Sequence, residues 1–277
     1  MQSQTSIKEI RPDNYRYLQE HIYSQVGIVL EEDKQYLFEG RLTPIVRQLG
    51  LDSINDLCTL LQTSRQTKIG RQVVEAMTTN ETYFFRDPAQ YDAIRAVLLP
   101  RLKEEQRDTR RLRFWSAAAS TGQEAYSLAM VLLEQGLSDW NIQILGTDFS
   151  SQVLDRARSG KYQQIEVNRG LPAALLVKHF RQSGVDWQLS DQVRRMVSFE
   201  AIDLRNSMHG LGPFDLVFCR NVMIYFDAGT RLNILKELHG TLFRGGWLLL
   251  GGVETAFGVE EWFDKQAVGD ATVYVAR

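Results

Sequence analysis

Over the first 75 residues the apolar side chains recur every three or four positions, a spacing that places them on one face of an α-helix. The first series is Tyr15, Leu18, Ile22 and Val26, and the second is Leu42, Ile45, Val46 and Leu49. Gly50 follows the second series as a C′ residue, and Ser53 is placed to cap a third helix. Pro44 should kink the second helix or mark its first turn. We predict an all-helical N-terminal domain over residues 1–76.

The periodicity breaks over residues 77–88, which we interpret as a linker. Asp87 and Pro88 predict a helix start, because aspartate is a good N-cap and proline suits the first helical position. The apolar face of this helix is expected to hold Tyr91, Ile94, Val97 and Leu98.

From residue 89 onward, short apolar runs alternate with amphipathic stretches. The predicted strands are 112–117, 142–147, 196–202, 214–219, 247–251 and 272–276. The predicted helices between them are 123–135, 150–158 and 230–242. Runs without polar alternation are typical of strands covered on both faces in a mostly parallel sheet. We predict a Rossmann-like α/β domain over residues 89–277, with the last strand antiparallel.

Residues 160–195 interrupt the alternation. They contain Gly160, Gly170, Pro172 and Gly184 together with short alternating stretches. We predict a small β subdomain inserted between the second and third strands of the sheet.

The composition is that of a soluble globular protein, with 277 residues, 44% of them hydrophobic, and a net charge of −2. Such a charge gives no support for a nucleic-acid partner. The N-terminus shows no signal pattern, and no apolar run approaches about 20 residues, so we expect a cytoplasmic protein without membrane insertion, as a monomer.

Cys58 and Cys219 are expected to be reduced core thiols, and the scattered histidines indicate no metal site.

Two strand ends carry the strongest functional signal. One strand runs into the small-residue loop Ser116–Gly122, and the next ends at Asp148. Small side chains let a ligand approach the loop backbone and the N-terminus of the following helix, and the carboxylate can accept hydrogen bonds from both ribose hydroxyls. The pair predicts a nucleotide site.

The ligand is either a nicotinamide dinucleotide or S-adenosylmethionine. A dinucleotide normally needs a G-x-G-x-x-G loop, whereas Ser116–Gly122 contains one glycine. Glu124 would repel a pyrophosphate but would receive the ammonium group of a methionine moiety. Taken alone, an acid in a first helical turn is also explained by the helix dipole. The residues favour the sulfonium cofactor.

Further polar residues follow the later strands at the same edge of the sheet. Asp203, or its backbone neighbours, is placed to meet adenine, and Arg220 and Asn221 follow the fourth strand. Tyr225 could reach over the methyl group, although a tyrosine at this place is more simply a core or rim residue.

Together these residues resemble the CheR-type chemotaxis receptor glutamate methyltransferases. The resemblance covers nearly the whole chain and rests on residues 78–86 (TTNETYFFR), 116–124 (SAAASTGQE), 157–162 (ARSGKY) and 218–227 (FCRNVMIYFD). It implies S-adenosyl-L-methionine as donor, S-adenosyl-L-homocysteine as product, and glutamates in the cytoplasmic adaptation region of chemotaxis receptors as acceptors. The implied cofactor contacts are Asn80, Thr82, Arg86, Glu124, Asp148, Asp203, Leu204, Arg220 and Asn221. The resemblance also implies that Arg86 and Tyr225 flank the reacting methyl group.

Two departures from the family pattern stand out. The usual Gly-Glu-Glu-Pro is Gly122-Gln-Glu-Ala125 here, which keeps Glu124. Residues 181–193 look shorter and poorer in glycine than in members that dock on a pentapeptide at a receptor's C-terminus. We therefore expect activity that does not depend on such a tether.

A glutamate acceptor suits the candidate residues. Its pKa of about 4.3 leaves it ionised at neutral pH, so no general base is required. The enzyme must align oxygen, methyl carbon and sulfur, and exclude water. Arg86 would orient a carboxylate through its two-donor fork, and Tyr225 would hold the acceptor through its hydroxyl.

Basic residues gather in the N-terminal domain at Arg41, Arg47, Arg65, Lys68 and Arg71. They form either an ordinary solvated face or a docking surface for acidic receptor helices.

Three other functions stay open from the sequence. A methyltransferase acting on RNA or a metabolite would share the fold. A non-catalytic adaptor could keep the cofactor pocket as a sensor, although it could afford to lose Arg86 or Tyr225, and both are present. A nicotinamide oxidoreductase is the most remote alternative.

Overall fold

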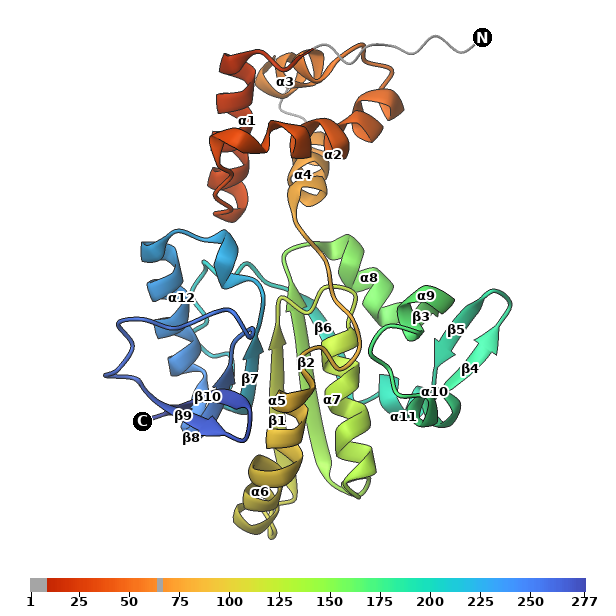
Figure 1. Ribbon diagram of the computed structural model, residues 1–277, viewed down its shortest axis with the longest axis vertical. Coiled ribbons are helices and arrows are strands. Elements are labelled where there is room, and N and C mark those ends of the chain that lie inside the picture. Colours follow the sequence, from red (N-terminus) through yellow and green to blue (C-terminus); the bar gives the residue numbers. More distant parts are fainter. Residues whose placement is uncertain (1–8, 64–66) are drawn as a thin grey trace. The chain divides into compact units, whose positions relative to one another are not determined.

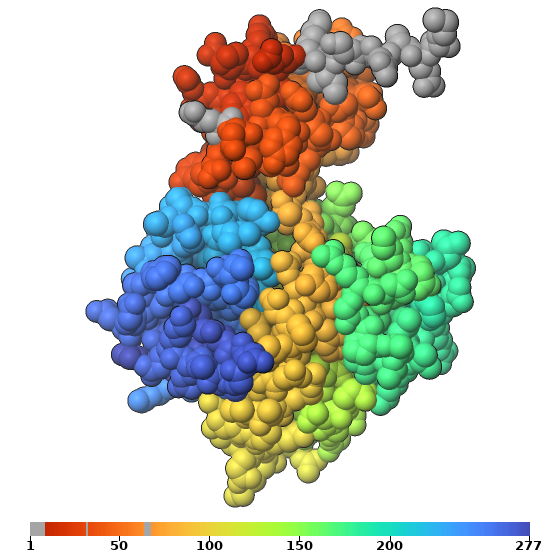
Figure 2. Space-filling model, in the orientation of Figure 1, coloured from red at the N-terminus to blue at the C-terminus, as the bar shows by residue number. Residues whose placement is uncertain are grey.

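The computed structural model describes residues 9–63 and 67–277. Their contacts form two compact units, shown in Figures 1 and 2. The smaller unit holds the residues up to Thr79 together with Tyr225–Asp227, and the larger unit holds Asn80–Ile224 and Ala228–Arg277. The division falls inside the segment 77–88 that we interpret as a linker.

The smaller unit is all-helical, as predicted. Its helices are α1 (Pro12–Val26), the 3₁₀ turn η1 (Glu32–Lys34), α2 (Gln35–Gln48), α3 (Ile54–Thr63) and α4 (Thr67–Met77). The apolar series is buried between them, with Leu18, Ile22 and Leu42 fully enclosed. The unit is therefore held together by one small apolar core.

The predicted caps of this unit are confirmed. Gly50 has φ of +67°, and its N–H donates to the Arg47 carbonyl at 3.1 Å. The Ser53 hydroxyl accepts from the Asp56 N–H at 3.2 Å. Pro44, however, lies deep inside α2 rather than in a first turn. The carbonyl that it deprives of a donor belongs to Gly40, and both residues are on the exposed side, where water can replace the lost bond.

The larger unit is built on a seven-stranded sheet. Its strand order is β6-β2-β1-β7-β8-β10-β9. The strands are β1 (Arg111–Ala117), β2 (Asn141–Asp148), β6 (Val197–Ala201), β7 (Phe214–Cys219), β8 (Leu242–Leu249), β9 (Phe263–Val268) and β10 (Ala271–Ala276). The first five strands in this order pair in parallel, and β10 is antiparallel to both β8 and β9. The mostly parallel sheet with an antiparallel last strand is thus confirmed. The sequence pattern missed β9 and the first half of β8.

Helices cover the strands. The chain enters through α5 (Pro88–Ala93), a π-helical turn (Ile94–Leu98) and α6 (Leu99–Glu105). Around the sheet lie α7 (Gln123–Glu134), α8 (Ser151–Ser159), the 3₁₀ turn η3 (Met223–Tyr225) and α12 (Ala228–Gly240). All six residues of β7 are buried, which explains its unbroken apolar run. Val97 was expected in the core but is exposed, because the π turn shifts the helical register there.

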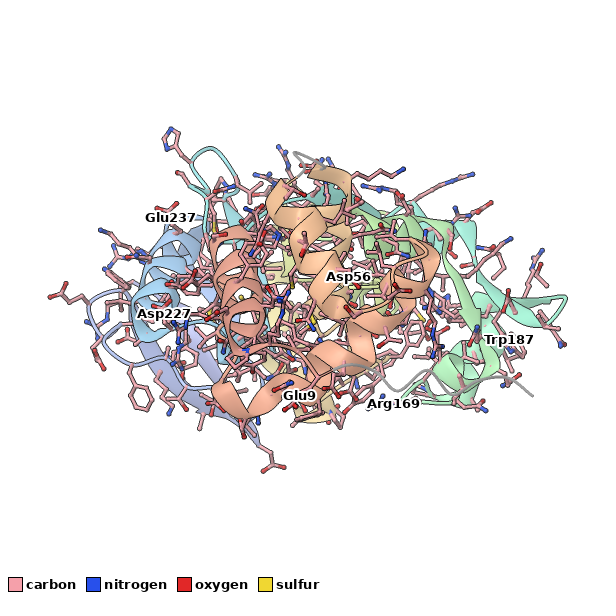
Figure 3. All side chains as sticks on the ribbon, turned by 90° about the horizontal axis from the view of Figure 1, so that it is seen from above. Glu9, Asp56, Arg169, Trp187, Asp227 and Glu237 are labelled. Atoms are coloured by element: carbon pink, nitrogen blue, oxygen red, sulfur yellow. The ribbon has the colours of Figure 1, made fainter. Side chains whose placement is uncertain are left out.

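The insertion forms a separate three-stranded antiparallel sheet in the order β3-β5-β4. Its elements are β3 (Lys161–Gln163), α9 (Gln164–Val167), α10 (Ala173–His179), β4 (Phe180–Ser183), β5 (Asp186–Leu189) and α11 (Asp191–Arg194). The Phe84 ring packs edge-on against the rings of Tyr162 and Phe180, at 5.0 and 5.6 Å between centroids. The Trp187 Nε1 donates to Gln164 Oε1 at 2.8 Å. Figure 3 labels Trp187 within this insertion. Figure 2 shows α5 (yellow) between the insertion (green) and the C-terminal strands (dark blue).

Within the described ranges, no helix has the length and apolar content needed to cross a membrane. Both cysteines are free and buried. The same residues contain no group of three histidine, cysteine or acidic side chains that could hold a metal ion.

Candidate active site

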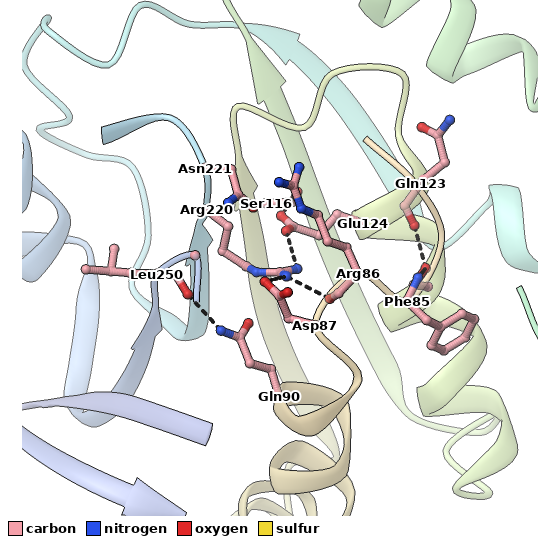
Figure 4. Close-up of polar contacts among 12 residues, drawn as sticks. Phe85, Arg86, Asp87, Gln90, Ser116, Gln123, Glu124, Arg220, Asn221 and Leu250 are labelled. Atoms are coloured by element: carbon pink, nitrogen blue, oxygen red, sulfur yellow. Dashed lines mark hydrogen bonds and ion pairs between the residues drawn. The ribbon is translucent and has the colours of Figure 1, made fainter. Parts of the chain in front are cut away.

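Arg220 directly follows β7 and is the centre of a buried charge cluster (Figure 4). Its side chain is 1% exposed. Nη1 donates to Glu124 Oε2 at 2.9 Å, and Nη2 donates to Asp87 Oδ2 at 2.6 Å and to the Arg86 carbonyl at 2.7 Å. A buried guanidinium needs such partners, because an unpaired charge away from water is costly. The cluster fastens the segment before α5 to the start of α7 and the end of β7.

Asp87 takes part in this cluster rather than in a helix cap. As predicted, α5 begins at Pro88, but the Asp87 side chain makes no cap hydrogen bond. Its φ is +57°, and its carboxylate turns to Arg220 instead. The ion pair outweighs the cap because a buried guanidinium needs several charged or polar partners, and Asp87 adds to those from Glu124 and the Arg86 carbonyl.

Glu124 lies in the first turn of α7, with its side chain 13% exposed. Its Oε1 accepts from the Ser116 hydroxyl at 2.6 Å, so the end of β1 also supports it. Burial raises the pKa of the Glu124 carboxyl, and Arg220 and Ser116 oppose that rise. Burial acts to lower the pKa of Arg220, but the field of Glu124 and its other neighbours outweighs this, and the pKa is raised. Each oxygen of Glu124 keeps capacity for a further donor.

The loop between β1 and α7 is shaped for small side chains. Ala118 and Ser120 have φ of +59° and +50°, and Gly122 has φ of +92°. A Cβ on Gly122 would lie 3.0 to 3.2 Å from atoms of Ala157, Phe199 and Tyr126. The backbone therefore passes close to the neighbouring helix and strand, and larger side chains would not fit.

Asp148, at the end of β2, ties this loop to the next one. Its Oδ2 accepts from the Ser120 N–H at 2.9 Å, and its Oδ1 accepts from the Ser150 N–H at 3.0 Å. The side chain stays partly exposed. A partly exposed carboxylate at the end of a parallel strand is suited to accept hydrogen bonds from ribose hydroxyls.

The Asp203 carboxylate is turned to Arg205. Arg205 donates to it through the backbone N–H at 2.9 Å, through Nε at 3.1 and 3.2 Å, and through Nη2 at 2.6 Å. Leu204 between them is buried. The Asp203 carboxylate is therefore engaged by Arg205, and the Asp203 carbonyl accepts from the Asn206 N–H at 3.0 Å. A contact of this segment with adenine stays a prediction.

Asn80 and Thr82 lie together at a pocket of about 440 Å³ in the larger unit. The Asn80 carbonyl accepts from the Ser120 hydroxyl at 2.9 Å, which joins this segment to the small-residue loop. The other lining residues are Glu81, Thr121, Gln123, Gln152, Val153, Arg156, Glu166 and Arg169.

Glu254 is a site residue that the sequence patterns did not indicate. Its Oε2 accepts from the backbone N–H groups of Asn221 and Gly251, each at 2.7 Å, and its Oε1 accepts from the Ile224 N–H at 3.3 Å. The carboxylate thus joins the loop after β7 to the loop after β8. Asn221 is held there with φ of +57°. The one sequence feature that could have indicated Glu254 is its place as an isolated acid in the glycine-rich stretch after the predicted strand 247–251.

Tyr225 belongs with the smaller unit. Its carbonyl accepts from the Val29 N–H at 2.9 Å, and nearby Asp227 accepts from the Tyr23 hydroxyl at 3.0 Å. Its pairing with Arg86 across the methyl group stays a prediction.

The predicted docking residues fall into different environments. Arg41 donates to the carbonyls of Met77 and Thr78 at 2.6 and 3.3 Å, so it closes the C-terminal end of α4. The sequence did not indicate that Arg41 would bond to the end of α4. Arg71 pairs with Glu75 at 3.4 Å along α4. Arg47 and Lys68 are exposed, and Arg65 lies outside the described residues.

Comparison with known proteins identifies the family to which this chain belongs. Residues 13–78 match the model of the CheR methyltransferase all-alpha domain, and residues 80–271 match that of the CheR methyltransferase SAM binding domain. The chain is 38% identical to chemotaxis protein methyltransferase 1 of Pseudomonas aeruginosa over 91% of this chain and 93% of that protein. It is 36% identical to chemotaxis protein methyltransferase 1 of Vibrio cholerae over 96% of this chain and 97% of that protein. The resemblance and the sulfonium cofactor predicted from the motifs are confirmed. The chain belongs to the CheR methyltransferase family, and its larger unit is the S-adenosylmethionine-binding domain of that family.

Proposed function

We propose that this protein transfers the methyl group of S-adenosylmethionine to glutamate side chains in the cytoplasmic adaptation region of chemotaxis receptors, forming methyl esters. The observation that supports this most strongly is the match of both family models, together with relatives over 90% of the chain that are named chemotaxis protein methyltransferases. We also propose that the protein acts in the cytoplasm as a monomer.

The residues at the strand ends fit the donor. Glu124 keeps acceptor capacity for its ammonium group, and the partly exposed Asp148 carboxylate at the end of β2 suits its ribose hydroxyls. We assign the backbone of Asp203 and Leu204 to the adenine, and Asn80 and Thr82 to the rim of the donor site. Arg220, held by two acids and a carbonyl, would act by positioning Glu124. Asn221 would close the site beside it.

When bound, the donor supplies a methyl group activated by a positively charged sulfur. In the proposed reaction a carboxylate oxygen of the acceptor forms a bond to the methyl carbon as the sulfur–carbon bond breaks, leaving a neutral thioether and a methyl ester. No proton moves, because the acceptor carboxylate is already ionised. The protein's contribution is therefore alignment and exclusion of water, which can lower a barrier by roughly 7–11 kcal/mol in favourable cases.

Arg86 is our candidate for the side chain that aligns the acceptor carboxylate. Its Nη1 donates to the Glu81 carbonyl at 3.2 Å, and it contributes to the electrostatic field at Glu124. Within the described residues no other hydrogen bond from this guanidinium is found, so donors remain for an acceptor. Replacing Arg86 by Ala, or Tyr225 by Phe, should lower turnover far more than it lowers the melting temperature. Normal turnover in both variants would remove these residues from the reaction.

We further propose that activity does not require a receptor C-terminal pentapeptide. The β4–β5 hairpin turns at Gly184 with only two residues between its strands, which leaves little loop for recognition. Deleting the last five residues of the receptor should leave kcat/KM within about twofold. A micromolar Kd for the isolated pentapeptide would contradict the proposal.

One experiment tests the function as a whole. The protein is incubated with methyl-labelled S-adenosylmethionine and the cytoplasmic fragment of a chemoreceptor from the same genome. Label on the receptor that alkali releases as methanol is the expected result for a methyl ester. The receptor with its candidate glutamates changed to alanine serves as the control. Label only on RNA, on small molecules or on no acceptor would refute the proposal.

A further inference from the structure

Two apolar side chains stand exposed beside the candidate active site. Val253, in the loop after β8, is 85% exposed, and Ile224, in η3, is 52% exposed. Single exposed apolar residues are common on protein surfaces and need no explanation. These two differ because both adjoin the same partly buried carboxylate.

That group is the Glu254 carboxylate. Ile224 donates its N–H to Oε1 at 3.3 Å, and Val253 is the residue directly before Glu254. The two apolar residues therefore flank one carboxylate, and they come from loops that follow adjacent strands, β7 and β8. We call Ile224 and Val253 the apolar rim.

The apolar rim is continuous with the charge cluster. A Cβ placed on Gly252, next to Val253, would lie 3.9 Å from Asp87 Oδ2, and Asp87 is bonded to Arg220. On the other side, the Asn221 N–H shares the Glu254 carboxylate with Gly251. The rim thus borders the charge cluster that also holds the backbone of Arg86, the residue that we propose aligns the acceptor carboxylate.

We propose that the apolar rim receives the apolar face of the receptor helix that carries the acceptor glutamate. This inference rests on the proposed function. A glutamate side chain is short, so the helix bearing it must touch the border of the site when the carboxylate reaches the methyl group. Residues three and four positions from an exposed glutamate lie on the same side of the helix, next to its apolar stripe. An apolar border would bury that stripe and exclude water from the reacting atoms.

The test uses Val253→Asp, Ile224→Asp and the double variant, because a charge on the rim would be buried without a partner. A matched control is Val177→Asp in α10, since Val177 is 81% exposed and lies in the insertion. The cytoplasmic receptor fragment is the substrate for kinetics. Calorimetry with S-adenosylhomocysteine and the melting temperature report on the donor site and on folding.

Each rim variant should raise KM for the receptor and lower kcat/KM about tenfold, the effect of losing one well-packed interface residue. Affinity for S-adenosylhomocysteine should stay within twofold, and Val177→Asp should behave as the unchanged protein. The inference is overturned if the rim variants methylate the receptor normally, if donor affinity falls in parallel with kcat/KM, or if only self-association changes. If the unchanged protein fails to label receptors, the proposed function fails and the inference falls with it.

Discussion

At the scale of single residues, the site depends on one buried cation. Arg220 is enclosed by Glu124, Asp87 and a carbonyl, so replacing it leaves two carboxylates near each other without compensation. Arg220→Met should lower the free energy of unfolding by about 3–5 kcal/mol, the usual cost of breaking a buried pair from one side. Urea unfolding measures this change.

A surface pair provides the control for that measurement. Arg277 and Asp264 pair with both side chains about half exposed, at 52% and 51%. Arg277→Met should cost less than about 1 kcal/mol, because water screens such a pair. An equal loss of stability in the two variants would contradict the buried-cluster interpretation.

Glu124 predicts how donor binding depends on pH. Burial raises the pKa of its carboxyl in the free site above the ordinary value of 4.5, whereas the ammonium of a bound ligand would lower it. Affinity for the donor should therefore be highest at pH values above the pKa of Glu124 in the free protein. It should fall as the pH is lowered through that pKa. Calorimetry with S-adenosylhomocysteine should show the decline beginning above pH 4.5. In Glu124→Gln, binding should be weaker and this decline should disappear; an unchanged pH profile would exclude Glu124 as the ammonium acceptor.

At the scale of elements, Gly170 fastens the insertion to the segment before α5. Its φ is +79°, and a Cβ on it would lie 2.0 Å from the Phe84 carbonyl oxygen. Gly170→Ala should lower the melting temperature by several degrees and weaken donor binding, because Phe84 lies between Thr82 and Arg86. Gly184→Ala is the matched control, since its φ is +64° and no atom lies within 4 Å of the added Cβ. Gly184→Ala should lower the free energy of unfolding by only about 1 kcal/mol, through backbone strain. Equal effects would show that the close contact is unimportant.

The apolar spacing predicted most elements because each depends on local periodicity. Phe214–Cys219 is a fully buried strand, and its unbroken apolar run was sufficient to place it. Phe263–Val268 is an edge strand with mostly exposed residues, so it lacked the apolar signal and was missed. Val97 was misplaced because a π turn cannot be read from a regular period.

The same reasoning explains which site residues could be found. Asp148 and Arg220 stand at the carboxyl ends of two parallel strands that flank β1, where topology alone gathers them at one edge. Glu254 joins Asn221 across 33 positions of sequence, and the partner of a single loop carboxylate is decided by tertiary packing. The hydrogen bond from Arg41 to the end of α4 could not be predicted, for the same reason. The motifs predict the donor site, but they could not show which groups hold its residues in place.

At the scale of the whole molecule, the net charge is −2, but residues 41–71 contain five basic residues and only two acidic ones. Arg47 on α2 and Lys68 on α4 are both exposed in the smaller unit, and α2 packs against α4. We expect these two residues to steer an acidic receptor, because exposed charges act mainly on association rates and partner choice. Arg47→Glu with Lys68→Glu should lower kcat/KM for the receptor at low salt and leave the Kd of S-adenosylhomocysteine unchanged.

Two comparisons separate steering from damage to the fold. The difference between the double variant and the unchanged protein should shrink as ionic strength rises, because a Debye length of about 10 Å at 0.1 M becomes about 3 Å at 1 M. Arg41→Ala should instead lower the melting temperature of the smaller unit, since this guanidinium holds the end of α4 at Met77 and Thr78. A loss of receptor activity that persists at high salt would show that Arg47 and Lys68 act through direct contacts rather than through long-range attraction. Loss of donor binding in the same variant would show that its folding was impaired.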